Sequence, residues 1–345
     1  MSQVANSTIL NNRMDIVFCI DDNYIMPCGV TIISLLENHK DNMITFHTVG
    51  LELKEESKKK LSSVCSRYRN ASILFYDVSK ESLDSYKLSL QNSRHLSLAT
   101  YARLFIENML PHDVDKVLYL DCDLIVVNNL SELWNTDIDG YAIAGVPDFY
   151  ICSSRPDTFQ RLDYSSVKGY VNAGVLLINL KYWREKKLIN VFLSFIKEKY
   201  DYLAFHDQDV INGTLYDSKL FLPIRFNILN SYYMSVNNDI NGHEDEVYEA
   251  LADPAIIHYT SPEKPWLRLS MHPLNREFIK YKKLSPWKDE ALAWPNISLS
   301  RKFRYYKRKV LYALGLKKPK YMDVRKDSGT GKYNIKKGKT WITIK

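Results

Sequence analysis

Two aspartates, Asp121 and Asp123, interrupt the apolar stretch VLYLDCDLIVV at residues 117–127. An ionised carboxylate is unfavourable in an apolar interior unless it is paired or binds a metal. If this stretch is one regular strand, the two side chains point to the same face, because side chains alternate along a strand. Two carboxylates on one face suit Mn²⁺ or Mg²⁺ that also binds a phosphate.

A second set of polar residues lies in IIHYTSPEKPW at residues 256–266. His258 follows two isoleucines, and Lys264 stands in a loop that holds two prolines. Imidazole with carboxylates is a plausible ligand set for Mn²⁺, and a lysine beside the ion would pair with a diphosphate. The alternative is a loop histidine bonded to the backbone and a solvated lysine.

Two further segments contribute charged residues. On a helix, Arg103 of HLSLATYAR (95–103) would share a face with residues 96 and 99 and reach the core, where a carboxylate partner is expected. FHDQD (205–209) places three polar side chains at an expected helix N-terminus, a position that acids also favour as caps. Capping accounts for one of them and leaves the others open to a site role.

The elements that must position these residues alternate between apolar strands and amphipathic helices, which indicates an α/β fold with a mostly parallel sheet. Ligands bind outside the carboxyl ends of such strands. Residues 231–265 are expected to be mostly loop. The expected strands cover residues 15–20, 44–50, 72–78, 117–127, 141–146, 175–180 and 219–223, and the expected helices cover 27–38, 54–68, 97–110, 182–199 and 207–215.

Composition places the chain among globular proteins, because 46% of its 345 residues are hydrophobic and 25% are charged. The five cysteines fit no zinc spacing and are interpreted as reduced, in a reducing compartment. The N-terminus has no signal-peptide pattern, and no apolar run approaches the roughly 20 residues that span a bilayer. A cytoplasmic location, peripheral on the inner face of the cell membrane, is therefore expected.

Charge divides unevenly along the chain. Residues 301–345 hold 16 Lys and Arg against two acids, whereas the remainder carries a net charge of −7. RKFRYYKRKVLYALGLKK (301–318) predicts a helix with an apolar stripe and a basic face, which is typical of an interfacial helix on anionic lipid. A solvated extension is the alternative, and nothing in the body of the chain supports a nucleic-acid partner.

Six ordered motifs together resemble glycosyltransferase family 8, the retaining nucleotide-sugar transferases of the bacterial lipopolysaccharide galactosyl- and glucosyltransferase type, related to glycogenin. The resemblance implies a GT-A fold with one Rossmann-like nucleotide-binding domain, expected over residues 14–285. The charge pattern adds a basic helical extension over residues 286–345. The motifs are FCIDDNY (18–24), HLSLATYAR (95–103), LYLDCD (118–123), YVNAGVLLINL (170–180), HDQD (206–209) and HYTSPEKPW (258–266).

The resemblance implies a role for each matched residue. Asp121, Asp123 and His258 would bind Mn²⁺, with Mg²⁺ as the alternative ion. Those that would contact the nucleotide or its diphosphate are Asp21, Asn23, Tyr24, His95, Cys122, Ser261 and Lys264. Ser261 replaces a glycine that the family often has. Those that would surround the donor sugar and serve catalysis are Arg103, Asn172, Asp207 and Gln208.

The implied reaction moves galactose or glucose from UDP to a saccharide acceptor, for instance a lipid-linked precursor of lipopolysaccharide or capsule. Asp148 is a further carboxylate at a strand end, with its role open. Two alternatives remain at this point. A haloacid-dehalogenase-type phosphatase also uses two strand-borne aspartates, but its motif lies on the first strand and has Thr or Val where Ile125 stands. A nucleotide-sugar-binding scaffold without catalysis would keep the same residues.

Overall fold

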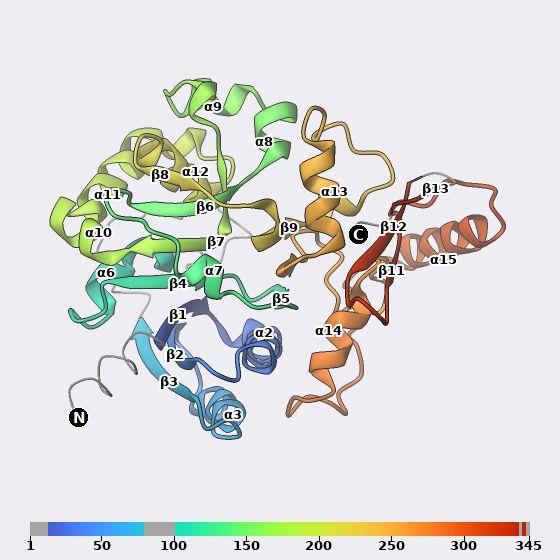
Figure 1. Ribbon diagram of the computed structural model, residues 1–345, viewed down its shortest axis with the longest axis horizontal. Coiled ribbons are helices and arrows are strands. Elements are labelled where there is room, and N and C mark those ends of the chain that lie inside the picture. Colours follow the sequence, from blue (N-terminus) through green and yellow to red (C-terminus); the bar gives the residue numbers. More distant parts are fainter. Residues whose placement is uncertain (1–12, 79–100, 338–339, 343–345) are drawn as a thin grey trace.

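The computed structural model describes residues 13–78, 101–337 and 340–342 (Figure 1). A central sheet runs through the body of the molecule, and the C-terminal elements lie at the end opposite α10 and α11. Within these residues, no helix is long and apolar enough to cross a membrane. All five cysteines are free thiols, as the sequence predicts.

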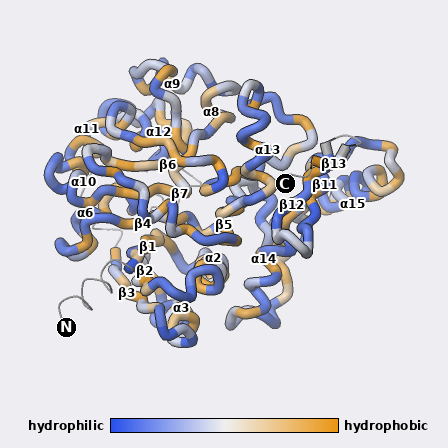
Figure 2. Tube along the Cα trace, in the orientation of Figure 1, coloured by the Kyte–Doolittle hydropathy of each residue, from blue (hydrophilic) through white to orange (hydrophobic). Residues whose placement is uncertain are grey.

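The central sheet has seven strands in the order β3-β2-β1-β4-β7-β6-β8. Only β7 runs antiparallel to its neighbours, so the α/β prediction with a mostly parallel sheet is confirmed. The strands read as continuous apolar runs because helices cover both faces, and Figure 2 shows hydrophobic stretches along β4, β6 and β7. Their bounds are β1 (Arg13–Ile20), β2 (Met43–Leu51), β3 (Ala71–Val78), β4 (Lys116–Leu120), β6 (Ile143–Pro147), β7 (Val171–Asn179) and β8 (Lys219–Phe221).

A second sheet corrects the prediction of one strand over residues 117–127. The chain leaves the central sheet after β4, and β5 (Leu124–Val126) belongs to a three-stranded sheet with β10 (Ile256–His258) and β9 (Ile228–Leu229). The apolar pattern hides this break because residues on both sides of it are buried. Asp121 and Asp123 therefore lie at the crossing between two sheets, where strand alternation no longer sets their directions.

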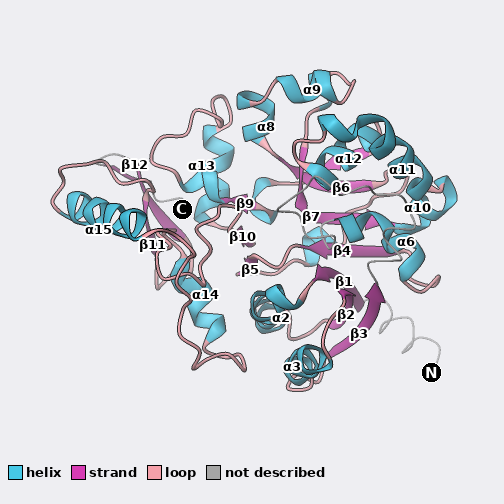
Figure 3. Cartoon of the chain, turned by 180° about the vertical axis from the view of Figure 1, so that it is seen from behind, coloured by secondary structure: helices cyan, strands magenta, loops and turns pink. Residues whose placement is uncertain are grey.

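Helices cover the two faces of the central sheet, as Figure 3 shows from behind, and they enclose two separate apolar cores. One core includes α2 (Ile25–Asn38), α3 (Glu55–Cys65), α13 (Glu244–Ala252) and α14 (Asn275–Lys282). The other includes α6 (Ile106–Met109), α9 (Asp157–Arg161), α10 (Leu180–Lys186), α11 (Leu188–Lys199) and α12 (His206–Leu215). The remaining short helices are α7 (Ser131–Trp134), α8 (Phe149–Ser154), η1 (Asp22–Tyr24), η2 (Arg103–Phe105), η3 (Ser166–Lys168), η4 (Tyr200–Tyr202), η5 (Ile224–Phe226) and η6 (Asn230–Tyr233).

Two of the predicted helices are interrupted in the structure. The described part of 97–110 is helical over residues 101–109, as expected, but the 3-10 helix η2 interrupts the α-helix before α6. The helix expected over 182–199 breaks between α10 and α11, where Lys187 adopts a left-handed conformation. Residues 231–265 are mostly loop, as expected, but α13 buries Val247 and Leu251 within this segment and β10 joins the second sheet.

The C-terminal region begins with the predicted amphipathic helix, α15 (Leu299–Ala313), none of whose residues is buried. It continues in an antiparallel sheet that the sequence analysis did not predict, formed by β11 (Asp323–Lys326), β12 (Tyr333–Lys337) and β13 (Thr340–Ile342). Val324 and Ile335 of this sheet belong to the same core cluster as α2. The division of the chain at residue 286 stays a prediction.

The burial of β12 predicts that the C-terminal sheet contributes to the stability of the body. Ile335 has no exposed surface, so Ile335→Ala is expected to lower the free energy of unfolding by about 2–5 kcal/mol. Leu316→Ala is the control, because Leu316 is 71% exposed and its change should stay within about 0.5 kcal/mol. Urea unfolding measures both. Equal midpoints for the two variants would contradict packing of β12 into the core.

Candidate active site

The seam between the two sheets forms the centre of the site. Asp121 directly follows β4, and its amide donates to the carbonyl oxygen of Gly174 in β7. Asp123 directly precedes β5, and its carbonyl oxygen accepts from the amide of Tyr259, just after β10. Each aspartate is thus hydrogen-bonded through its backbone to a different sheet, and the turn at Cys122 connects the two.

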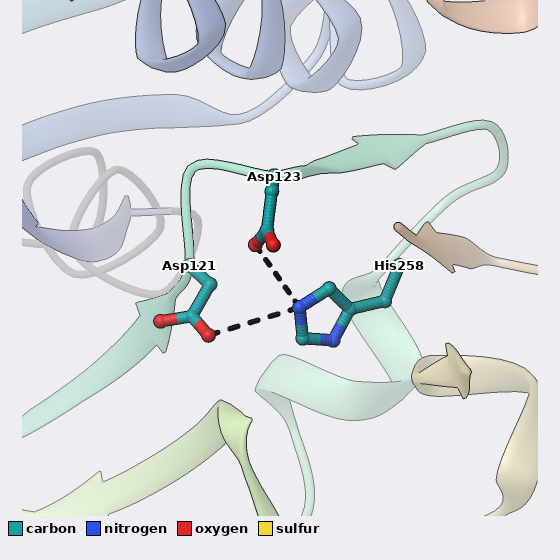
Figure 4. A group of neighbouring side chains, drawn as sticks. All are labelled: Asp121, Asp123 and His258. Atoms are coloured by element: carbon teal, nitrogen blue, oxygen red, sulfur yellow. Dashed lines mark hydrogen bonds and ion pairs between the residues drawn. The ribbon is translucent and has the colours of Figure 1, made fainter. Parts of the chain in front are cut away.

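His258 reaches the two aspartates because β10 pairs with β5, with His258 opposite Leu124. Its Nε2 lies 3.1 Å from Asp123 Oδ1 and 3.7 Å from Asp121 Oδ2, and Figure 4 shows both carboxylates pointing toward the ring. One ligand atom from each residue lies within 4.8 Å of the others. Two carboxylates and an imidazole at this spacing fit a divalent cation of the Mn²⁺ or Mg²⁺ type.

Gly174 leaves the space in which this cluster forms. A Cβ at this position would lie 2.2 Å from His258 Cε1 and 2.7 Å from Asp121 Oδ2, closer than any side chain allows. The glycine of YVNAGV is therefore required for the close approach of β7 to the seam.

Lys264 closes one side of the cluster. Its ammonium donates to Asp123 Oδ2 at 2.5 Å and to the carbonyl oxygen of Tyr259 at 2.7 Å. Burial by itself would raise the pKa of Asp123, but Lys264 and His258 outweigh it and hold that pKa far below its usual range. Asp123 is therefore anionic at neutral pH, as a metal ligand must be. Ser261 turns the same loop, because its hydroxyl accepts from the amide of Glu263.

Arg103 lies on the other side, between Asp121 and Asp207. Its Nη2 is 3.0 Å from Asp121 Oδ1 and its Nε is 2.9 Å from Asp207 Oδ2. The guanidinium also donates to the carbonyl oxygen of Ala173 and stacks over the ring of Tyr119. Burial raises the pKa of Asp207 to about 6, although Arg103 lowers it. The arginine thus has the carboxylate partners that the sequence predicts.

This arrangement predicts a pH-dependent cost of removing the arginine. Arg103→Leu is expected to destabilise the protein by about 3–5 kcal/mol at pH 8, because it leaves buried Asp207 without its cation. A carboxyl whose folded pKa exceeds its unfolded value of about 3.9 favours folding at low pH and loses that contribution as pH rises through the folded pKa. The difference between variant and wild type should therefore shrink at pH 5, where Asp207 is protonated.

Arg225→Leu is the matched control for this measurement. Arg225 also contacts two carboxylates, those of Glu132 and Asp253, but its side chain is partly open to solvent. Its loss should change the unfolding free energy by no more than about 1 kcal/mol. Urea unfolding at pH 5 and pH 8 compares both variants with wild type, and an equal cost of Arg103→Leu at both values would contradict the assignment to Asp207.

Next to Arg103, two side-chain amides and one carboxylate form a hydrogen-bond network. Gln208 Oε1 accepts from the amide of Ala173, and its Nε2 lies 3.5 Å from Asp148 Oδ2. Asn172 Nδ2 donates to the same oxygen at 3.1 Å. Burial raises the pKa of Asp148, and these hydrogen bonds oppose the shift. Asp148, which the sequence left without a role, therefore joins Asn172 and Gln208.

The sequence predicts that only one of the polar residues 207–209 serves the N-terminus of the helix, and these contacts agree with it. Asp209 is the structural member, since it accepts from the amide of Phe205 and from the hydroxyl of Tyr170. Asp207 and Gln208 instead face the site. The motif HDQD thus supplies Asp209, which stabilises the start of α12, and two site residues, Asp207 and Gln208.

Three of the residues expected to hold the nucleotide, Asp21, Asn23 and Tyr24, lie at the carboxyl end of β1. Asp21 caps η1 by accepting from the amide of Asn23, and the ring of Tyr24 meets Trp266 edge-on at 6.2 Å. Burial and then the charge of Asp123 raise the pKa of Tyr24 to about 12, so its hydroxyl stays neutral beside the aspartates. The Cys122 side chain is buried in the core. His95 lies outside the described residues.

Three site residues were not assigned from sequence. Tyr119 donates its hydroxyl to Asp121 Oδ1, and Gly174 gives the cluster its space. Both stand inside motifs that the sequence analysis quoted, so inspection of neighbouring positions could have found them. Asn227 bonds His258 from a segment without any motif, and only the tertiary structure reveals it.

Solved structures similar to this one share its architecture. The galactosyltransferase LgtC, solved in complex with donor and acceptor sugar analogs, superimposes with a TM-score of 0.68 at 29% identity, covering 84% of this chain and all of LgtC. Glycosyltransferase GlyE of Streptococcus pneumoniae shares the fold, with a TM-score of 0.58 at 20% identity over 91% of this chain and 67% of GlyE. Fold and site therefore define a glycosyltransferase of the GT-A class.

Sequence comparison narrows the class. The model of glycosyl transferase family 8 matches residues 15–270, and the chain belongs to this family. General stress protein A of Bacillus subtilis is 28% identical over 79% of this chain and 94% of its own length. Lipopolysaccharide glucosyltransferase WaaO of Escherichia coli is 27% identical over 84% of this chain and 83% of its own. Family membership excludes the phosphatase alternative.

Proposed function

We propose that this enzyme is a retaining hexosyltransferase that moves galactose or glucose from a UDP-sugar to a saccharide acceptor with the help of Mn²⁺, or Mg²⁺ as the alternative ion. One observation carries the proposal. Two carboxylates, an imidazole and a lysine converge at the seam of the two sheets, beside buried polar groups suited to a sugar. The names of the relatives, among them a lipopolysaccharide 1,3-galactosyltransferase of Salmonella typhimurium, support a hexose donor and a surface-glycan acceptor.

Asp121, Asp123 and His258 would hold the divalent ion. When bound, the ion neutralises negative charge on the diphosphate of the donor. Asp123 is anionic through its contacts with Lys264 and His258, and Asp121 is oriented by Tyr119 and Arg103.

The nucleotide would lie along the carboxyl ends of β1 and β4. Asp21 and Asn23 would bind the uracil and ribose, and the partly exposed ring of Tyr24 would stack on the base. Lys264 would move from Asp123 Oδ2 to the diphosphate once an ion occupies the carboxylates, because its ammonium then gains a stronger anionic partner. This charge stabilises the UDP leaving group, and no general acid is needed there.

The sugar would face Arg103, Asp207, Asn172 and Gln208. Retention through a covalent intermediate requires a nucleophile on the face opposite the leaving group. Gln208 is a poor nucleophile, and its oxygen already accepts from the amide of Ala173. We therefore favour attack on the same face: the C1–O bond to the β-phosphate breaks, the acceptor oxygen bonds C1, and its proton passes to the departing phosphate oxygen.

Release of UDP from a panel of UDP-sugars by purified protein with Mn²⁺ tests this function. Slow release from UDP-galactose or UDP-glucose that stops when the metal is chelated supports the proposal and identifies the donor. Metal-dependent binding of UDP without release would favour an obligatory acceptor or a binding protein without turnover. Absence of UDP binding would reject the proposal.

The basic extension would hold the enzyme at an anionic membrane surface, close to a lipid-linked acceptor. The apolar stripe of α15 is exposed, with Leu299 at 81%, Phe303 at 73% and Val310 at 57%, and Lys and Arg dominate the rest of the helix. Each basic residue near such a surface contributes about 1 kcal/mol.

Point substitutions test this placement better than deletion of residues 301–345, because deletion would also remove the buried strand β12. Phe303→Ser with Val310→Ser is expected to reduce co-sedimentation with vesicles that contain anionic lipid. Val167→Ser is the control, since Val167 is 90% exposed on the body of the molecule. Equal sedimentation of the double variant and wild type would remove α15 as the membrane contact.

A further inference from the structure

We propose that Asn227 is a positioning residue that fixes the tautomer of His258 and connects this ligand to the groups around the donor sugar. Asn227 lies between η5 and β9, outside every family motif quoted above, and it is fully buried. The inference rests on the proposed function, because it assigns Asn227 a role at that same site.

Hydrogen bonds from an unambiguous donor set the direction of each amide. The backbone N–H of Gly174 can only donate, and it contacts Asn172 Oδ1 at 3.1 Å. Asn172 therefore directs its Nδ2 toward Asp148, at 3.1 Å. The atom of Asn227 that lies 2.9 Å from Asn172 Oδ1 must then be its own Nδ2, because an oxygen there would have no proton to donate.

The orientation of Asn227 determines the tautomer of the imidazole. With Nδ2 facing Asn172, Oδ1 of Asn227 faces His258 Nδ1 at 2.8 Å. An amide oxygen only accepts, so His258 carries its proton on Nδ1. Nε2 is the nitrogen that faces Asp121 and Asp123, and a cation bound there would take its lone pair in place of a proton.

The same contacts connect the two halves of the site. Asn227 joins His258 to Asn172, and Asn172 and Gln208 share Asp148 Oδ2. All these groups except Gln208 are at least nine-tenths buried, so few waters compete for the bonds. A displaced Asn227 would therefore disturb the metal ligand and the sugar-side amide together.

The test compares Asn227→Leu with Asn227→Asp. Leucine has a similar size and neither accepts nor donates, whereas aspartate keeps an oxygen for His258 Nδ1–H and loses the donor to Asn172. Asn38→Leu is the matched control, because the Asn38 side-chain amide also donates, to the carbonyl oxygens of Ser34 and Val126 and to the Tyr281 hydroxyl, and contacts no metal-ligand side chain. Thermal unfolding identifies variants that fail to fold.

Two readouts do not depend on turnover. The first is the tautomer of His258 in metal-free protein, from ¹⁵N spectra of labelled histidine, with His258→Gln used to assign the signal among eight histidines. The second is the dissociation constant of Mn²⁺ from a titration followed by electron paramagnetic resonance. Asn227→Leu is expected to lose the defined Nδ1–H signal and to bind Mn²⁺ about 10–100-fold more weakly. Asn227→Asp should recover the tautomer and most of the affinity.

The outcomes separate this inference from the proposed function. Wild-type protein that binds neither Mn²⁺ nor Mg²⁺ would reject the metal-dependent function, while the tautomer measurement would still test Asn227. Folded Asn227→Leu that keeps the Nδ1–H signal and wild-type affinity would overturn the inference. If Asn227→Leu does not fold, the Asn227→Asp variant decides, because loss of the tautomer despite the retained acceptor would also overturn it.

Discussion

Asp123→Asn is expected to abolish metal binding and to reduce release of UDP by about 10³-fold, the upper end of what one electrostatic group contributes. Asp123 contacts both His258 and Lys264. The change therefore removes the negative charge that pairs with the Lys264 ammonium and that would bind the cation together with His258. Asparagine has the same shape and can still fill the turn between β4 and β5. The fold should therefore survive the loss of function.

Mn²⁺ titration and UDP release measure this effect, and circular dichroism checks the fold. Asp217→Asn is the control, because Asp217 pairs with Lys168 on the surface away from the seam. Its activity should match that of wild type. Wild-type affinity for Mn²⁺ in Asp123→Asn would show that the ion binds elsewhere and would remove the central observation behind the proposed function.

Gly174→Ala is expected to weaken Mn²⁺ binding by about 100-fold or more and to lower UDP release in parallel. The added methyl group would lie 2.2 Å from the His258 ring and 2.7 Å from the Asp121 carboxylate, so both ligands must move. Overpacking by one methyl group typically costs about 1–3 kcal/mol of stability, which a folded protein of this size tolerates.

Gly213→Ala separates the local effect from general overpacking. A Cβ at Gly213 would lie 2.3 Å from the Phe195 ring, in the contact between α11 and α12. The stability loss should be similar, but metal affinity should stay unchanged because no ligand moves. If both variants bind Mn²⁺ with wild-type affinity, the cluster adapts to the methyl group. The prediction that the site requires glycine at position 174 would then be wrong.

Local sequence patterns determined much of this protein. The apolar strands and amphipathic helices predict the α/β fold because each pattern reports which sides of its own element are buried. The six motifs indicate the family, since their order and spacing survive at low overall identity. The apolar stripe and basic charge of residues 301–318 likewise predict α15, because a helical stripe is visible within a few turns of sequence.

Other features depended on pairings between distant segments. The break at Asp121–Asp123 is invisible in VLYLDCDLIVV because both sides of it are buried, and only the pairing of β5 with β10 shows the change of sheet. The same pairing brings His258 to the aspartates. The sheet β11–β12–β13 escaped prediction because its buried positions are few and separated by polar or charged residues.

The donor sugar, the ion and the acceptor stay predictions, because they depend on differences such as one hydroxyl group that local patterns do not encode. Asn227 is the clearest case of what only the tertiary structure decided. Its neighbours in sequence form no motif, and its importance comes from two amide bonds to residues 31 and 55 positions away. A side chain acquires such a role from what the fold packs against it, which the composition and spacing of its own segment do not record.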